Sequence, residues 1–450
     1  MVQTLPENAA ATGGQEVVAA APRVKRPWPE PTPAPVMRPW LRSQSVSVAR
    51  HAAALRPYVS GEFGPGPQSP SEGHLQAVNA LIERLRAELI KVSRTVKEAA
   101  DLAIKEPSTQ NLQAVVTRKQ RAHDLVRGIE KVWDFYFELF GQRQSSFGNW
   151  LLSTDRIALD CYRGVYTRVG MPKPVPAPPP FTYMRTGFSP ATFRRGIRLS
   201  KLGRQLNPFP LIQLPYHRMV NPWTLGAVLH EVSHNLQSDL GLSKVVPTSI
   251  ARALLDAGLP ASVAATWARW NRETFADLSA VLLGGPAVVG SLMDVVGRSP
   301  EQTLNFVPGK PHPTPYLRVL ISCELLRRMG FPEDSKRHRK AWMRIYPNPA
   351  AGTIPAPMLE TFEAANQIVV DTVCYRPLAE LGDRTLAQVG RFRPEHQMMI
   401  EEAARRLAAG NDPGIVPERF LIGAARVALD RKLARPGVIA TNFYKELERR

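Results

Sequence analysis

Residues 221–240 read NPWTLGAVLHEVSHNLQSDL and predict a helix that carries a His-Glu-x-x-His motif. Asn221 is a suitable N-cap, and Pro222 is favoured in the first helical turn. His230 and His234 are four residues apart, so a helix places both imidazoles on one face, where they can bind the same metal ion. The stretch therefore predicts a metal site built on a single helix.

Glu231, between the two histidines, indicates that the metal serves catalysis. From the same helix its carboxylate faces the open side of the ion, where it can accept a proton from a metal-activated water and pass it to a leaving amine. The plainer alternative is a pair of histidines on a helix surface with an incidental glutamate. Acidic residues farther along the chain favour the metal site over that alternative.

A catalytic zinc ion needs a third protein ligand and leaves a fourth position open for water. No histidine follows His234 at the HxxGxxH spacing, which argues against the metzincin arrangement. Glu273, in the segment WNRETFAD, is the expected third ligand, and Asp277, one turn later, can accept a hydrogen bond from a ligating imidazole. The alternative is an exposed acidic pair. Apolar neighbours favour burial, and an unpaired buried acid is costly, so the ligand role is preferred.

A third element follows, in which His312 and Pro313 precede Arg318 and Val319. HExxH followed by ExxAD resembles the glutamate-type zincins, or gluzincins. The third element is similar to the HP…R[IV] signature of the CAAX prenyl protease family and its heat-shock membrane protease relatives. The resemblance covers roughly residues 222–325, about a quarter of the chain.

This resemblance implies a role for each motif residue. The zinc ligands are expected to be His230, His234 and Glu273, and Glu231 is the expected general base. Asp277 is expected to accept a hydrogen bond from a ligating imidazole. His312 and Arg318 are expected to border the site. His312 is a candidate catalytic residue that stabilises an oxyanion, the alternative being an ordinary loop histidine. Arg318, Tyr216 and His217 are candidate substrate-binding residues.

Composition divides the chain into five predicted regions. They are a disordered Pro/Ala-rich segment (1–70), a helical hairpin region (71–170), a Pro-rich connector (171–208), a zinc metallopeptidase core (209–345) and a helical C-terminal region (346–450). Within the core, Phe209–Leu214 is short, apolar and bounded by prolines, which predicts a strand whose edge can pair with an extended peptide. The expected fold is mainly α, with a zincin-like catalytic core and a short edge strand or small sheet.

Several features predict a soluble, cytoplasmic protein. The three cysteines are far apart and lack CxxC spacing, so neither a disulfide framework nor a cysteine zinc site is expected. Residues 1–26 lack the charged and apolar regions of a secretory signal. The most apolar long stretch, Leu278–Val296, is interrupted by glycines and a proline, and it predicts two buried helices around a turn without membrane insertion. The membrane-embedded relatives therefore do not imply a prenylated substrate here.

Lys and Arg number 58 against 39 Asp and Glu, which gives a formal net charge of +19. Such a surface is compatible with an anionic partner. The charge is spread thinly, however, and no nucleic-acid-binding motif with interleaved aromatic residues is evident. A basic nucleic-acid adaptor with an incidental HExxH motif is therefore kept only as a third alternative.

Together these features predict zinc-dependent hydrolysis of peptide bonds, with a peptide or protein as substrate. The main alternative is a non-catalytic, zinc-stabilised helical scaffold or interaction protein with a basic surface. Structural zinc sites usually close with four ligands, often cysteines, and no cysteine lies near the motif, which favours catalysis. None of these features sets the oligomeric state.

Overall fold

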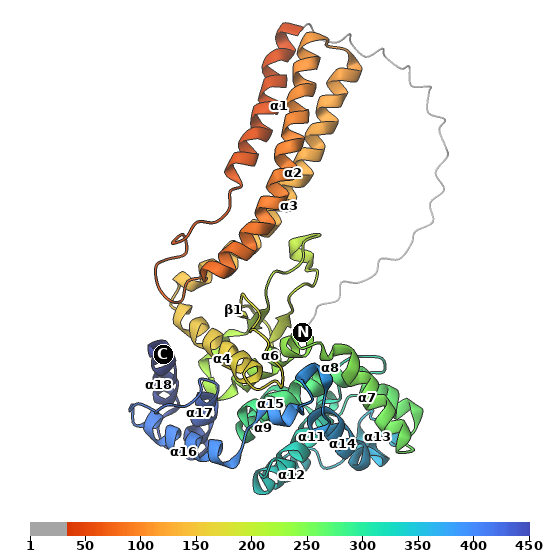
Figure 1. Ribbon diagram of the computed structural model, residues 1–450, viewed down its shortest axis with the longest axis vertical. Helices are drawn as coiled ribbons and strands as arrows, with labels where there is room; N and C mark the ends of the chain where they lie inside the picture. The colour runs from red at the N-terminus through yellow and green to blue at the C-terminus, as the bar shows by residue number, and fades with distance from the viewer. Residues whose placement is uncertain (1–33) are drawn as a thin grey trace, which may run out of the picture.

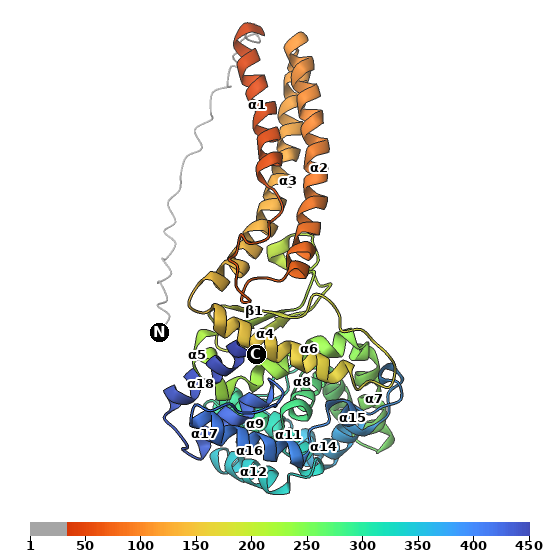
Figure 2. The ribbon, with the colours of Figure 1, turned by 60° about the vertical axis from the view of Figure 1, so that its left-hand side comes forward.

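The computed structural model describes residues 34–450, which form two visibly different parts (Figure 1). A long helical stalk, residues 34–141, stands on a rounded and mainly helical body, residues 142–450 (Figure 2). The disorder predicted for residues 1–33 lies outside the described residues.

The stalk consists of α1 (Ala34–Ala54), α2 (Glu72–Lys105) and α3 (Thr109–Gly141). α2 has 34 residues and is therefore about 50 Å long. Its buried apolar residues recur at steps of three, four or seven, among them Leu75, Val78, Ile82, Leu89 and Val96. Ser108 begins α3, because its hydroxyl accepts the Asn111 N–H at 3.2 Å. α2 and α3 are the two helices of the hairpin that the periodicity predicts.

Residues 34–70 do not form the predicted disordered segment. α1 buries Leu41, Val48 and Ala52 within the stalk. After α1, the backbone N–H and carbonyl of Tyr58 are both hydrogen-bonded to the Asn79 side chain. The prediction of disorder is therefore wrong for this part of the chain, because a few apolar side chains spaced four and seven residues apart suffice to hold a helix against a hairpin.

The body confirms the expectation of a mainly helical fold. Its helices are α4 (Gly148–Tyr166), α5 (Tyr216–Val220), α6 (Gly226–Asp239), α7 (Leu242–Asp256), α8 (Ala261–Gly284), α9 (Pro286–Val296), α10 (Pro300–Thr303), α11 (Pro315–Arg328), α12 (Pro332–Ile345), α13 (Ala356–Glu360), α14 (Phe362–Val370), α15 (Leu386–Gly390), α16 (Pro394–Ala408), α17 (Phe420–Asp430) and α18 (Pro436–Arg449). Gly285, with φ +69°, separates α8 from α9 at the turn predicted within the apolar stretch. No helix among residues 34–450 combines the length and the apolar character needed to cross a membrane.

A small three-stranded sheet lies between the stalk and the body. It consists of β1 (Phe181–Met184), β2 (Ala191–Phe193) and β3 (Leu211–Leu214), in the order β1-β3-β2. β3 pairs with β1 in parallel and with β2 in antiparallel orientation. The predicted edge strand is therefore the central strand. The region 171–208, predicted as a connector, supplies both of its neighbours.

The sheet separates two hydrophobic cores. On one face, Phe181 and Leu211 pack with residues of the stalk, including Tyr136. On the other face, Ile212 and Leu214 belong to the core of the body. This division follows from the alternation of side chains along a strand. The sheet thus joins the base of the stalk to the helices that carry the HExxH motif.

Candidate metal centre

α6 carries the HExxH motif but begins later than the sequence predicts. Pro222 opens a short 3-10 turn, and the Asn221 side chain donates to the His217 carbonyl instead of capping a helix. Gly226 then begins α6 in close contact with α9, where an added Cβ would lie 2.7 Å from the Cβ of Ser291. Glycine at this position lets α6 approach α9, which places the motif deep in the body.

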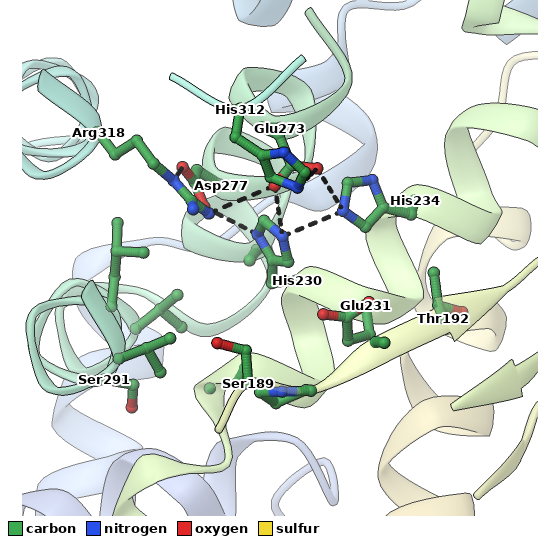
Figure 3. A pocket seen from close by; sticks show the side chains of 18 of the residues that line it. Ser189, Thr192, His230, Glu231, His234, Glu273, Asp277, Ser291, His312 and Arg318 are labelled. Atoms are coloured by element: carbon green, nitrogen blue, oxygen red, sulfur yellow. Dashed lines mark hydrogen bonds and ion pairs between the residues drawn. The ribbon is translucent and has the colours of Figure 1, made fainter. Parts of the chain in front are cut away.

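Three side chains from α6 and α8 converge on one point (Figure 3). The Nε2 atoms of His230 and His234 are 3.1 Å apart, and each lies 3.4 Å from an oxygen of the Glu273 carboxylate. A tetrahedral ion with bonds of about 2.0–2.1 Å holds its ligand atoms about 3.3–3.4 Å apart, so these separations suit a small metal ion. The three predicted ligands are thus brought together and can hold a metal ion.

Asp277 lies behind His230, as its spacing from Glu273 predicts. Its Oδ1 is 2.8 Å from Nδ1 of His230, a contact that orients the ring with Nε2 toward the ligand group. Arg318, from α11, donates to both oxygens of Asp277 at 2.7 and 2.8 Å. Arg318 also lines the cavity beside the metal ligands, so the substrate contact predicted for it stays a prediction. Its guanidinium holds Asp277, because a buried carboxylate needs a charged partner.

The surroundings shift the pKa values of the two histidines in opposite directions. Burial acts to lower the pKa of His230, but the Asp277 and Glu273 carboxylates outweigh it and raise the value to about 10. Burial and the charge of His230 lower the pKa of His234 to about 3. At Glu273 burial favours the neutral acid, yet the histidines and Arg318 hold the pKa well below its usual range. The acidic side chains therefore favour positive charge at the position of His230.

Glu231 is buried and lines the cavity next to the ligands. Burial raises the pKa of its carboxyl to about 7, although the charge of His230 acts in the opposite direction. A carboxyl that ionises near neutral pH suits a group that accepts a proton and returns it. In Figure 3, Glu231 and His312 lie on opposite sides of the ligand group.

The site opens into a cavity of about 350 Å³. An apolar wall comes from α8 and α9, with Ala280, Val288, Leu292 and Val295. Residues 189–192, which lead into β2, form another part of the lining. The Asn235 amide donates to the Thr192 hydroxyl at 2.7 Å and so ties β2 to α6. Sequence reasoning missed this pair, although Asn235 directly follows the HExxH motif.

The remaining predicted residues divide into one that borders the cavity and two that do not. His312 lies in the loop before α11, with Nε2 3.5 Å from a Glu273 oxygen and 66% of its side chain exposed. Tyr216 and His217 are not among the residues that line the cavity. Tyr216 instead stacks on Trp150 of α4. Neither residue borders the cavity, and the prediction that these two residues bind substrate stays a prediction.

A scan against protein-family models, a search of the curated proteins and a search of the solved structures each found no match. Function therefore has to be inferred from the geometry and the chemistry of the site.

Proposed function

We propose that this chain is a zinc-dependent peptidase of the gluzincin type, with a zincin-like core around α6 and α8. The observation that carries the proposal is the meeting of three ligand atoms 3.1 to 3.4 Å apart beside a buried glutamate. In this proposal His230, His234 and Glu273 bind the ion, and Glu231 is the general base.

The donor set favours a catalytic zinc ion. Two imidazoles and one carboxylate suit zinc, whereas calcium and magnesium prefer oxygen ligands. Three protein ligands leave a position open toward the cavity, which is typical of catalytic sites, because structural sites usually have four ligands. The three cysteines are buried and contribute nothing to the ligand group. The zinc-stabilised scaffold is therefore the less supported alternative.

A bound zinc ion supplies Lewis acidity, which activates water and polarises a carbonyl group. Glu231 accepts the proton of the attacking water and returns it to the leaving amine nitrogen, a role that suits its pKa of about 7. His312 is close enough to the ligands to donate a hydrogen bond to the oxyanion that develops on the carbonyl oxygen. Asp277 and Arg318 keep His230 oriented throughout.

In this proposal the substrate is an extended peptide that pairs with β2. β2 is an edge strand because it pairs with β3 alone, and its residues Ala191 and Thr192 line the cavity. Main-chain hydrogen bonds to an edge strand position a peptide without depending on its side chains. The bond from Asn235 to Thr192 holds the strand at a fixed position relative to the ligands. β2 thus takes the role that the sequence assigned to Phe209–Leu214.

Metal content and cleavage of a mixed peptide library, measured on the same samples, test the proposal. Wild-type protein is expected to contain zinc and chain in equimolar amounts. Glu273→Ala is expected to lose most of the zinc. Glu231→Gln is expected to keep zinc while cleavage falls by about 10²–10⁴-fold. Glu301→Gln removes an exposed acid outside the site and serves as the control. Wild-type protein that takes up no zinc after metal-replete preparation would overturn the proposal.

A further inference from the structure

A second cavity, of about 690 Å³, lies where α8, α11 and α15 meet, and it shares no lining residue with the metal site. Arginine is its most frequent lining residue, at positions Arg328, Arg384, Arg391 and Arg393. None of the described residues that line it is acidic. We refer to it as the arginine cavity. A lining of this kind attracts an anionic ligand.

Most of this positive charge has no counter-charge in the fold. Arg328 is paired, since its guanidinium lies 2.5 Å from an oxygen of Asp371. Arg384 donates to a backbone carbonyl at 2.8 Å. Neither Arg384, Arg391 nor Arg393 forms an ion pair with any residue in the range 34–450. Three of the four lining arginines therefore have no acidic partner among residues 34–450.

Arg391 also has a backbone conformation that arginine rarely adopts. It ends α15 with φ +50° and ψ +45°, a left-handed position that helix ends usually give to glycine. The Cβ atom makes this conformation unfavourable, and strain of this kind clusters at ligand-binding sites. Among the described residues, Asp383 and Lys432 also have a positive φ without being glycine, and Arg391 is the one of the three that lines the arginine cavity.

We propose that the arginine cavity binds a small molecule that carries at least two linked phosphate groups. A guanidinium donates two parallel hydrogen bonds to one phosphate, a geometry that lysine cannot reproduce. Three arginines without carboxylate partners match the charge of a pyrophosphate unit better than that of a single carboxylate. Free pyrophosphate and a nucleoside triphosphate both contain this unit. The site is separate from the metal centre and does not depend on the proposed peptidase activity.

Isothermal titration calorimetry of the full-length protein with pyrophosphate tests this proposal, with sulfate as the reference anion. Arg391→Gly and Arg393→Gln are each expected to weaken pyrophosphate binding by about tenfold or more, because each removes charge-assisted hydrogen bonds. Arg252→Gln makes the same change in net charge on an exposed face of α7, and its affinity is expected to stay within about twofold of wild type. Glu273→Ala is expected to bind pyrophosphate with unchanged affinity. This result would exclude binding at the metal ligands.

ATP and adenosine distinguish the two sources of the phosphate unit. If ATP binds more tightly than pyrophosphate, the ligand is a nucleotide. If the two affinities are equal and adenosine does not bind, the cavity recognises the phosphates alone. Arg391→Gly is expected to melt at the same or a higher temperature, because glycine relieves the left-handed strain, and this separates lost binding from lost folding. Pyrophosphate that binds no more tightly than sulfate, or an equal loss in Arg252→Gln, would overturn the proposal.

Discussion

The stalk and the body are both helical, but they bury different kinds of side chain. Within residues 34–141, the buried side chains are apolar or aromatic except for His74. The body also buries ionisable groups, among them Glu231, His234 and Asp277. The core of the stalk is mainly apolar, whereas the body keeps charges away from water at a cost that only specific partners offset. Buried charge thus marks the part of the chain where structure serves chemistry.

Two histidines, one in each part, illustrate the difference. His74 in α2 contacts the Ser71 hydroxyl at 2.7 Å and the Pro179 carbonyl at 3.0 Å, and burial lowers its pKa. His230 in α6 faces the carboxylates of Asp277 and Glu273, which raise its pKa. Burial favours the uncharged ring at His74, whereas the two acids favour positive charge at His230.

The largest expected effect comes from removing Arg318, because the Asp277 carboxylate then remains buried without its guanidinium partner. Arg318→Met is expected to lower the free energy of unfolding of the metal-free protein by about 3–5 kcal/mol. Lys97→Met breaks an exposed ion pair with Asp101 in the stalk. This variant is expected to change the free energy of unfolding by about 1 kcal/mol or less. Urea denaturation followed by circular dichroism measures both variants, and equal losses would remove the distinction between stalk and body.

A smaller side chain in the core of the stalk tests the same distinction between stalk and body. Leu89 is fully buried in α2, so Leu89→Ala leaves a cavity and is expected to cost about 2–4 kcal/mol of stability. Zinc content and peptide cleavage are expected to stay at wild-type levels, because Leu89 belongs to the core shared by the stalk and the sheet and not to the body core. Denaturation and metal analysis of one sample give both results. Zinc lost together with stability would mean that stalk and site form one cooperative unit.

The smallest expected effect is a pH dependence at the base of the stalk. Burial lowers the pKa of His74 below its unfolded-state pKa of 6.5, so the folded chain favours the neutral ring. The stability that this preference contributes is present above pH 6.5 and is lost as the pH falls. His74→Gln keeps an amide for hydrogen bonding, so it is expected to lose less stability than wild type between about pH 7 and about pH 5. Thermal unfolding across this range measures the two slopes, and identical slopes would contradict the assignment.

The candidate metal ligands could be predicted because two helical motifs carry them, and the resemblance to gluzincins implied that both motifs hold one ion. HExxH places His230 and His234 on one face of α6, and ExxAD places Glu273 and Asp277 one turn apart on α8. The partner of Arg318 could not be predicted in this way, because α8 and α11 meet only in the folded chain. The motif identifies the residue, and tertiary structure brings its guanidinium to Asp277.

The strands β1 and β2 and the helix α1 were missed for related reasons. β1 and β2 have four and three residues, too few for an alternating pattern, and each pairs with a strand elsewhere in the sequence. α1 has few apolar positions in a segment rich in Pro, Ala and Ser, and its burial depends on the hairpin that follows it. Composition alone therefore indicated disorder where tertiary contacts supply the order.

The central claim is that His230, His234 and Glu273 bind one zinc ion. X-ray absorption at the zinc K-edge, on purified zinc-loaded protein, tests this claim most directly. We expect two imidazoles and further oxygen ligands at about 2.0–2.1 Å, with the same spectrum in Glu231→Gln and a different one in Glu273→Ala. A sulfur shell at about 2.3 Å, or a spectrum without imidazole scattering, would contradict it.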